Sequence, residues 1–268
     1  MSPISATCWL EISEMSGNGE FLNALRFMTI VPVPSSDTAS RSDWLSRCAK
    51  YFPAVGICIG LVSAAALLLA GAIWGPVIAA LFAVAASIAV TGALHEDGLA
   101  DTVDSFGGGW SVEKRLAIMK DSRIGAYGTL ALVFGVALRV TAMAEMPLWS
   151  GAAALISAHA AARITPAFVM NALRYAGDTA AMKVSYTDAP VSANDVRFAL
   201  IVVVCALVPL AFVSIPSVIS GLLLGAVLST AIALWARRLI DGYTGDVLGA
   251  IEQMFEIGFL LGVAAIIR

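Results

Sequence analysis

The sequence predicts an all-α fold: a polytopic integral membrane bundle of about seven transmembrane helices. Hydrophobic residues make up 59% of the 268 positions and charged residues only 13%, whereas roughly a quarter of the residues in soluble proteins are charged. A helix that crosses the bilayer core needs about 17–25 mainly apolar residues. Seven segments meet this need, although some are short or interrupted by glycine: 54–73, 77–94, 128–146, 149–169, 199–215, 217–236 and 250–267.

The region before the first span has two parts. Residues 1–20 mix glutamate with glycine and serine and lack the basic start of a signal peptide, so we expect a disordered leader there. Residues 21–28 are apolar over most of their surface but too short to span a bilayer, which is typical of an interfacial helix. The prolines at 32 and 34 prevent that helix from continuing. We therefore expect a single membrane domain over residues 21–268.

Basic residues gather in alternate connections between the spans. The short turns near 75, 147 and 215 carry no lysine or arginine. By the positive-inside rule the long connections therefore face the cytoplasm, which would bring the polar motifs described below to one side of the membrane. The residues that support this orientation are Arg26, Arg41, Arg47, Lys50, Lys114, Arg115, Lys120, Arg123, Arg174, Lys183, Arg197, Arg237 and Arg238.

The most informative motif is a group of four acids within nine positions, Glu96, Asp97, Asp101 and Asp104, at the end of a long uncharged segment. In a helix the three aspartates stand on one face. Two carboxylates ~4 Å apart repel by roughly 1 kcal/mol in water and about 4 kcal/mol at an effective dielectric near 20. Such a stripe favours a bound divalent cation with oxygen ligands. A solvated helix end is the alternative, but it does not explain why the acids share one face. His95, next to them, is a further candidate ligand or base.

A second polar motif, residues 120–123, lies in the longest connection that contains helix-breaking residues. The planar guanidinium of Arg123 is suited to pair with two phosphate oxygens, and Asp121 either adds an acid or orients that arginine. The glycines at 125 and 128 would let the backbone approach a ligand closely. An ordinary basic loop is the alternative interpretation.

The last span begins with a polar segment that contains Thr244 and Asp246. Asp246 falls in the first turn of the expected helix, where the helix dipole favours an acid. Asp246, Gln253 and Glu256 recur at helical spacing, which predicts a polar stripe directed into the bundle.

Five further residues have structural interpretations. Arg139 is an intramembrane charge, which costs about 2.5–3.5 kcal/mol at mid-helix, and Glu145 is its expected partner. His159 is expected to form a hydrogen bond between helices, and Arg163 to lie near the cytoplasmic end of its span. Arg115 is expected on a solvated helix face.

Four segments of the chain together carry a family resemblance. They are LRFMTIVPVP (25–34), HEDGLADTVDSFGGG (95–109), IMKDSRIGAYG (118–128) and GYTGDVLGA (242–250). In this order, and across residues 21–268, they resemble the cobalamin synthase family, whose members are adenosylcobinamide-GDP ribazoletransferases.

The resemblance implies a single membrane transferase domain in the bacterial inner membrane, with a cytoplasmic active face and Mg²⁺ as cofactor. It implies an enzyme that joins adenosylcobinamide-GDP to alpha-ribazole, or to its 5′-phosphate, and releases GMP. The expected partners are therefore a corrinoid nucleotide, a ribazole and the lipid bilayer, with no nucleic acid.

The resemblance also implies roles for individual residues. Four acids would hold magnesium on the diphosphate: Glu96, Asp97, Asp101 and Asp104. Arg123 and Lys120 would stabilise charge on the transferred phosphate or the departing GMP, and Asp121 or Asp246 would orient the ribazole hydroxyl or take its proton. The expected catalytic residues are Asp97, Asp101, Asp104, Asp121 and Arg123, and the expected substrate-binding residues are Arg26, Lys120, Ser122, Tyr127, Thr244 and Asp246.

Two alternatives remain open on the residues alone. A membrane phosphotransferase of the CDP-alcohol or prenyl type also uses spaced aspartates, but the segments 121–128 and 244–250 argue against it. A transporter would place charges on broken spans at mid-membrane, whereas most charges here gather at one face.

Overall fold

The computed structural model describes residues 17–33, 43–177 and 190–267. These residues form helices and, apart from one isolated bridge between Tyr175 and Tyr243, contain no β-structure. The α-helices are, in chain order, α2 (Gly17–Met28), α3 (Trp44–Cys48), α4 (Phe52–Gly71), α5 (Pro76–Thr91), α6 (Leu94–Gly108), α7 (Val112–Met119), α8 (Ala126–Ala144), α9 (Leu148–Ala162), α10 (Thr165–Ala172), α11 (Ala193–Val213), α12 (Ile215–Ile240) and α13 (Gly245–Ala264).

Six helical stretches within the described residues are long and apolar enough to cross a membrane. They are α3 to α4 taken together, α8, α9 to α10 taken together, α11, α12 and α13. The pair α5 and α6 makes a seventh if it is counted as one span, although the two helices are bent by 90° at the break between them. Each of the seven predicted segments overlaps one of these helices, so the predicted helical membrane bundle is confirmed.

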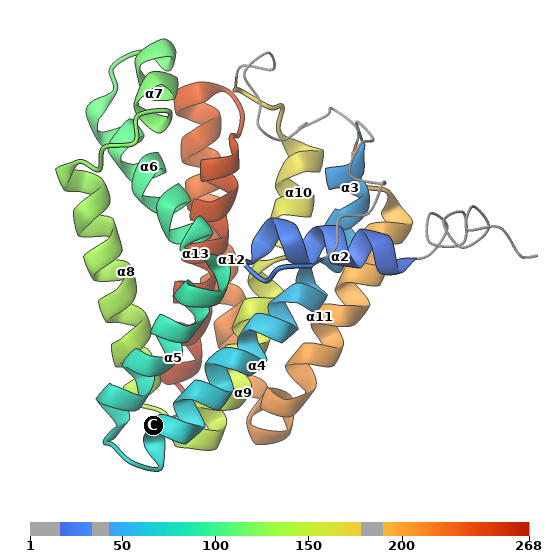
Figure 1. Cartoon of the computed structure of the whole chain (residues 1–268), viewed down its shortest axis with the longest axis vertical. Coiled ribbons are helices and arrows are strands. Elements are labelled where there is room, and N and C mark those ends of the chain that lie inside the picture. Colours follow the sequence, from blue (N-terminus) through green and yellow to red (C-terminus); the bar gives the residue numbers. More distant parts are fainter. Residues whose placement is uncertain (1–16, 34–42, 178–189, 268) are drawn as a thin grey trace, which may run out of the picture.

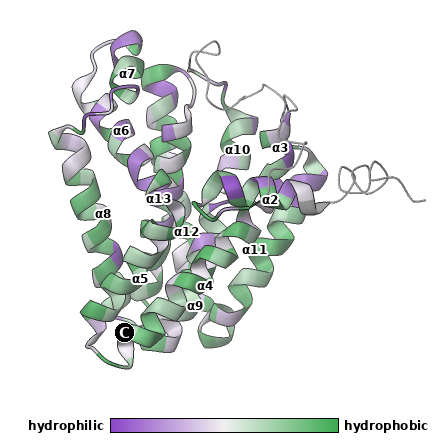
Figure 2. Cartoon of the chain, viewed as in Figure 1, coloured by the Kyte–Doolittle hydropathy of each residue, from purple (hydrophilic) through white to green (hydrophobic). Residues whose placement is uncertain are grey.

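The helices surround α13 (Figure 1), which packs against α12, α6, α9 and α8. Large apolar side chains remain exposed on the outer helices, among them Leu69 on α4, Phe82 on α5, Phe134 on α8 and Phe212 on α11. Figure 2 shows that these helices are hydrophobic along most of their length. This is the surface that a bilayer would cover.

The connections separate to two ends of the bundle. In Figure 1 the α4–α5 and α8–α9 turns lie at one end, close to the C-terminus, whereas α7 and the loops beside it lie at the opposite end. Figure 2 shows polar residues around α6 and α7 at that opposite end. The short turns without lysine or arginine and the long basic loop are thus on opposite sides, as the distribution of basic residues predicts.

The break between α5 and α6 directs the acidic helix toward α13. Gly92 and Ala93 both adopt left-handed backbone conformations, with φ of 61° and 60°. The N–H of Ala93 donates to the carbonyl of Ile88 at 3.0 Å, and Ile30 from the segment after α2 donates to the carbonyl of Val90 at 2.9 Å. A β-carbon at Gly92 would lie 2.5 Å from the Ile30 side chain. The segment that follows α2 therefore holds the turn between α5 and α6 in place.

The structured domain begins earlier than predicted. α2 starts at Gly17, inside the segment expected to be a disordered leader, and residues 1–16 of that segment lie outside the described residues. Glu20 is buried and pairs with Arg47 at 2.8 Å and with Lys50 at 2.7 Å. In Figure 1, α2 runs across the bundle rather than along it, as expected for an interfacial helix.

Candidate functional site

The four acids of the first motif lie on α6, which is helical throughout as predicted. Their environments differ along the helix. Asp97 is exposed, Asp101 is half-buried, and Glu96 and Asp104 are buried with 6% and 8% of their surfaces exposed. The stripe is therefore not one uniform set of ligands.

Asp104 binds the beginning of α8. Its two carboxylate oxygens accept hydrogen bonds from the backbone N–H groups of Gly125 at 2.7 Å and Gly128 at 2.8 Å. α8 has no side-chain cap of its own, because its N-cap residue is Gly125, so Asp104 satisfies amides that the helix leaves unpaired. A β-carbon at either glycine would overlap the Asp104 carboxylate. In this structure the close approach allowed by the two glycines is to Asp104, rather than to the ligand that the sequence suggested.

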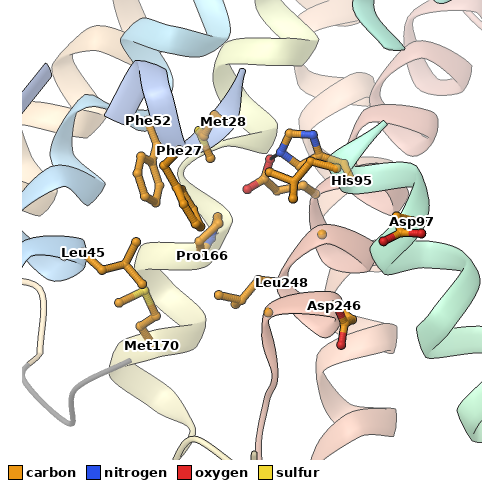
Figure 3. A pocket seen from close by; sticks show the side chains of 14 residues that line it. Phe27, Met28, Leu45, Phe52, His95, Asp97, Pro166, Met170, Asp246 and Leu248 are labelled. Carbon is orange, nitrogen blue, oxygen red and sulfur yellow. Dashed lines mark ion pairs between the residues drawn. The ribbon is translucent and has the colours of Figure 1, made fainter. Parts of the chain in front are cut away.

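Asp97 and Asp246 come together where α6 crosses α13. The helices approach closely because glycines, Gly98 and Gly249, form the crossing point. A β-carbon at Gly98 would lie 2.7 Å from the Asp246 carbonyl oxygen. A β-carbon at Gly249 would lie 3.3 Å from the α-carbon of His95. Both aspartates line a cavity of about 180 Å³ (Figure 3). Two motifs that are far apart in the sequence thus present carboxylates to one space.

The pKa of Asp101 reflects the negative charge of the neighbouring carboxylates. α6 is not by itself long and apolar enough to cross a membrane. Burial, followed in order of importance by the negative charges of Asp97, Asp246 and Asp104, raises the pKa of Asp101 to about 7. Like charges disfavour ionisation of a neighbour, so a bound cation would relieve a cost already present in the protein.

The donor set fits magnesium held jointly with a substrate. In the described part of the chain, no three His, Cys, Asp or Glu side chains are grouped so that they could hold a metal ion by themselves. Mg²⁺ rarely requires such a group, because it keeps several waters and is usually bound by one or two carboxylates together with substrate phosphates. Asp97 and Asp101, one helical turn apart and the least buried of the four acids, are the residues suited to this role.

The second motif forms an exposed ion pair. Nη2 of Arg123 lies 2.6 Å from Asp121, and its Nε donates to the same carboxylate at 3.0 Å. This hydrogen bonding lowers the pKa of Asp121 to about 2. The Arg123 side chain is 86% exposed, so Asp121 orients a guanidinium that is accessible to solvent.

The remaining residues predicted in this loop have surface positions. Lys120, at the end of α7, and Ser122 are exposed. Tyr127 is 55% exposed, and its ring covers Gly107 of α6, where a β-carbon would lie 2.8 Å from it. The expectation for Arg115 is wrong: its Nη1 donates to the carbonyl of Leu239 at the end of α12 at 3.0 Å, so it ties α7 to α12 instead of lying on a solvated face.

Two other predicted substrate-binding residues are at helix ends. Thr244 is the N-cap of α13 and accepts a hydrogen bond from Val247 N–H at 3.3 Å, so it has a structural role in starting the helix that carries Asp246. Arg26 lies exposed in the last turn of α2.

Glu96 belongs to a buried ion-pair network. Its Oε1 accepts hydrogen bonds from both terminal nitrogens of Arg139 at 3.0 Å. Arg139 also contacts Glu256 at 3.3 Å, and Glu256 lies 3.0 Å from Nδ1 of His159. The predicted Arg139–Glu145 pair is therefore wrong, since Glu145 is exposed at the end of α8. The expected contact of His159 between helices is confirmed.

The sequence reasoning missed Glu252. It is buried on α13, lies 2.9 Å from Nε2 of His95 and lines the same cavity as Asp97 and Asp246. The signal was present: an acid inside an apolar span is rare and usually paired, and Glu252 stands one turn before Glu256. His95 is thus bound to a carboxylate on the neighbouring helix.

The comparisons with known proteins identify the family to which the chain belongs. The family model described as cobalamin-5-phosphate synthase matches residues 20–264. Proteins named adenosylcobinamide-GDP ribazoletransferase are similar to the chain: one from Azorhizobium caulinodans is 41% identical, covering 90% of this chain and 93% of its own, and one from Shewanella piezotolerans is 38% identical, covering 88% and 91%. A third, from Leptothrix cholodnii, is 38% identical over 90% of this chain and 93% of its own. No solved structure matches. The chain therefore belongs to the cobalamin-5-phosphate synthase family.

Proposed function

We propose that this protein is a magnesium-dependent inner-membrane transferase that joins adenosylcobinamide-GDP to alpha-ribazole, or to its 5′-phosphate, and releases GMP. The name of its relatives, adenosylcobinamide-GDP ribazoletransferase, supports this reaction. The observation that carries the proposal for this chain is the meeting of Asp97 and Asp246 at one cavity where α6 crosses α13.

In this reaction a ribose hydroxyl of the ribazole attacks the phosphorus that stays on the cobinamide. The bond from that phosphorus to the oxygen bridging to GMP breaks, and the hydroxyl proton passes to a base. Little covalent chemistry is required of the protein, so its contribution is positioning and electrostatic stabilisation. A bound Mg²⁺ would neutralise charge on the diphosphate, with Asp97 and Asp101 as its protein ligands.

Asp246 is the better candidate to orient the attacking hydroxyl or to take its proton. The other candidate, Asp121, is engaged by Arg123 and has a pKa lowered to about 2, which makes it a weak proton acceptor at neutral pH. Asp121 is better suited to hold Arg123, whose exposed guanidinium can pair with a phosphate of the substrate.

We also infer that the end of the bundle with α7 faces the cytoplasm. The support is the excess of lysine and arginine in its connections. The same gathering of charged groups at one end argues against a transporter, and membership of this family argues against an enzyme of the CDP-alcohol or prenyl type.

The test uses purified full-length protein in liposomes. We expect GMP and a corrinoid product only when adenosylcobinamide-GDP, a ribazole and Mg²⁺ are all present, with no GMP when any one is withheld. Failure of the wild-type protein to release GMP from the complete mixture would refute the proposed function. Equal release in the presence of a chelator would refute the magnesium requirement alone.

A further inference from the structure

The cavity that contains Asp97 and Asp246 has a second, apolar side. Apolar side chains reach it from four helices: Phe27 of α2, Leu45 of α3, Phe52 of α4 and Met170 of α10. Figure 3 shows these four side chains on one side of the cavity, and Asp97 and Asp246 on the other. The space therefore joins an aromatic, apolar compartment to a pair of carboxylates.

The aromatic wall is well ordered. The rings of Phe27 and Phe52 stack with their centroids 5.9 Å apart and 22° between their planes. Phe27 also meets the edge of Trp44, at 5.7 Å and 80°. Phe52 is almost fully buried, whereas Phe27 is only partly buried. A flat apolar ring could thus pack against the partly buried Phe27 and the adaptable side chain of Met170, which line the same side of the cavity.

We propose that this compartment binds the aromatic base of the ribazole, an inference that rests on the proposed function. Of the groups in the two substrates, the corrin macrocycle is far too large for 180 Å³, while an apolar cavity of about 150 Å³ takes up benzene. Guanine carries polar atoms around its whole edge, and these would lose their hydrogen bonds against phenylalanine, leucine and methionine. The dimethylated benzimidazole of ribazole presents flat faces and methyl groups, which match that wall.

This binding mode places the attached ribose at the polar side of the cavity. The base would lie against Phe27 and Met170, so the sugar next to it would extend toward Asp97 and Asp246, where the attacking hydroxyl is needed. It also gives α2 a function. The segment 25–34 contains none of the acids of the site, yet it supplies the aromatic face of the compartment.

The test measures the two substrates separately. Phe27→Leu keeps an apolar side chain of similar size but removes the flat ring, and should raise KM for the ribazole by about tenfold or more, with KM for adenosylcobinamide-GDP unchanged. Met170→Ala enlarges the compartment and should reduce the preference for the dimethylated base over unsubstituted benzimidazole. Equilibrium binding of free dimethylbenzimidazole to each variant, without corrinoid, provides a readout that does not depend on turnover.

The matched control is Phe134→Leu. Phe134 is 62% exposed on the outer face of α8, so its replacement should leave both KM values at the wild-type level. Suppose that the wild type is active, and that Phe27→Leu and Met170→Ala match this control in both KM values and in base binding. This result would refute the base pocket and leave the proposed function standing. Loss of co-purifying lipid in these variants, with ribazole binding unchanged, would instead assign the compartment to an acyl chain. An inactive wild type that still binds dimethylbenzimidazole at this site would refute the function and leave the pocket.

Discussion

Asp97 and Asp104 lie on the same helix but should respond differently to the same substitution. Asp97 is exposed beside the cavity, so Asp97→Asn should leave the fold intact and lower turnover by roughly 100-fold or more. Asp104 holds the first amides of α8, and Asp104→Asn replaces one accepting oxygen by a donor, which should lower the free energy of unfolding by about 1.5–3 kcal/mol. Thermal unfolding in detergent and GMP release measure the two effects. An Asp104→Asn protein that is inactive but as stable as wild type would make Asp104 a ligand instead.

The raised pKa of Asp101 leads to a prediction of how magnesium binding depends on pH. Its pKa in the folded protein, about 7, is above the ordinary value of 3.8. The folded state therefore holds this proton more tightly than the unfolded state, and the contribution of Asp101 to stability falls as the pH rises from about 4 to 7. Mg²⁺ must displace the proton below pH ~7, so the increase in Tm caused by Mg²⁺ should be larger at pH 8 than at pH 6. Asp101→Asn should reduce this difference. An equal Mg²⁺ effect at both pH values in wild type would contradict the assignment.

At the residue scale, the sequence identified the acids but not their individual roles. Periodicity places Asp97, Asp101 and Asp104 on one face, and the structure agrees. It cannot indicate that Asp104 faces the amides of Gly125 and Gly128, or that Glu96 faces Arg139, because both partners arrive from α8 through tertiary packing. The expected Arg139–Glu145 pair fails for the same reason: Glu145 is the acid nearest to Arg139 in the sequence, but the partners in the structure, Glu96 and Glu256, come from other helices.

The crossing of α6 and α13 depends on small residues at the point of contact. Gly98→Ala adds a β-carbon 2.7 Å from the Asp246 carbonyl oxygen, so the helices must separate and the alignment of Asp97 with Asp246 must change. We expect a loss of activity together with destabilisation of about 1–3 kcal/mol. Gly135→Ala in α8 is the control, since its β-carbon would meet only Ile257 and Leu99 side-chain atoms at 3.5 and 3.6 Å and would gain up to about 1 kcal/mol of helix propensity. Full activity in Gly98→Ala would show that this crossing does not align the site.

The contribution of the loop between α7 and α8 to catalysis should depend on the planar guanidinium of Arg123. Arg123→Lys keeps the charge but loses the planar fork that can pair with two phosphate oxygens. If this contact strengthens in the transition state, kcat and kcat/KM should fall together, by roughly 100- to 1,000-fold. Arg115 cannot serve as the control, because it binds the end of α12. Arg197→Lys, at an exposed position in the first turns of α11, is the matched change and should be tolerated. Equal, mild effects at both positions would reduce this loop to an ordinary basic connection.

At the element scale, hydropathy predicted where helices lie, and turn chemistry was the weaker guide. Each predicted span overlaps a helix. An apolar segment long enough to cross the bilayer must satisfy its backbone hydrogen bonds without water, and a helix does so within one segment. The 90° bend after α5 was not predicted. Gly92 is a recognisable C-terminal signal, but the turn also includes the left-handed Ala93, and it is contacted by Ile30, which is distant in the sequence and donates to the carbonyl of Val90. Hydropathy and spacing along the chain do not reveal this contact, so they could not predict the bend.

At the scale of the whole molecule, the ion pairs inside the bundle tie together the helices that form the site. Arg139 of α8 joins Glu96 of α6 to Glu256 of α13, and Glu256 contacts His159 of α9. Charges buried at this depth are costly unless they are paired. The network therefore favours a single arrangement of four helices, and with it the relation of α6 to α13 on which the cavity depends.

A single active face requires that α7 and the end of α12 lie on the same side of the membrane. In a cysteine-free background, Trp110→Cys and Arg238→Cys, both at exposed positions, should react with a membrane-impermeant thiol reagent only from the cytoplasmic side. Glu145→Cys is the control for the opposite side, because Glu145 is exposed in the α8–α9 turn, which has no lysine or arginine and lies at the other end of the bundle. Labelling of 110 and 238 from opposite sides would contradict the bundle itself, since α6 and α13 could not then meet at Gly98. Labelling of both from the outside, with 145 reacting from the cytoplasm, would keep the site and reverse its orientation.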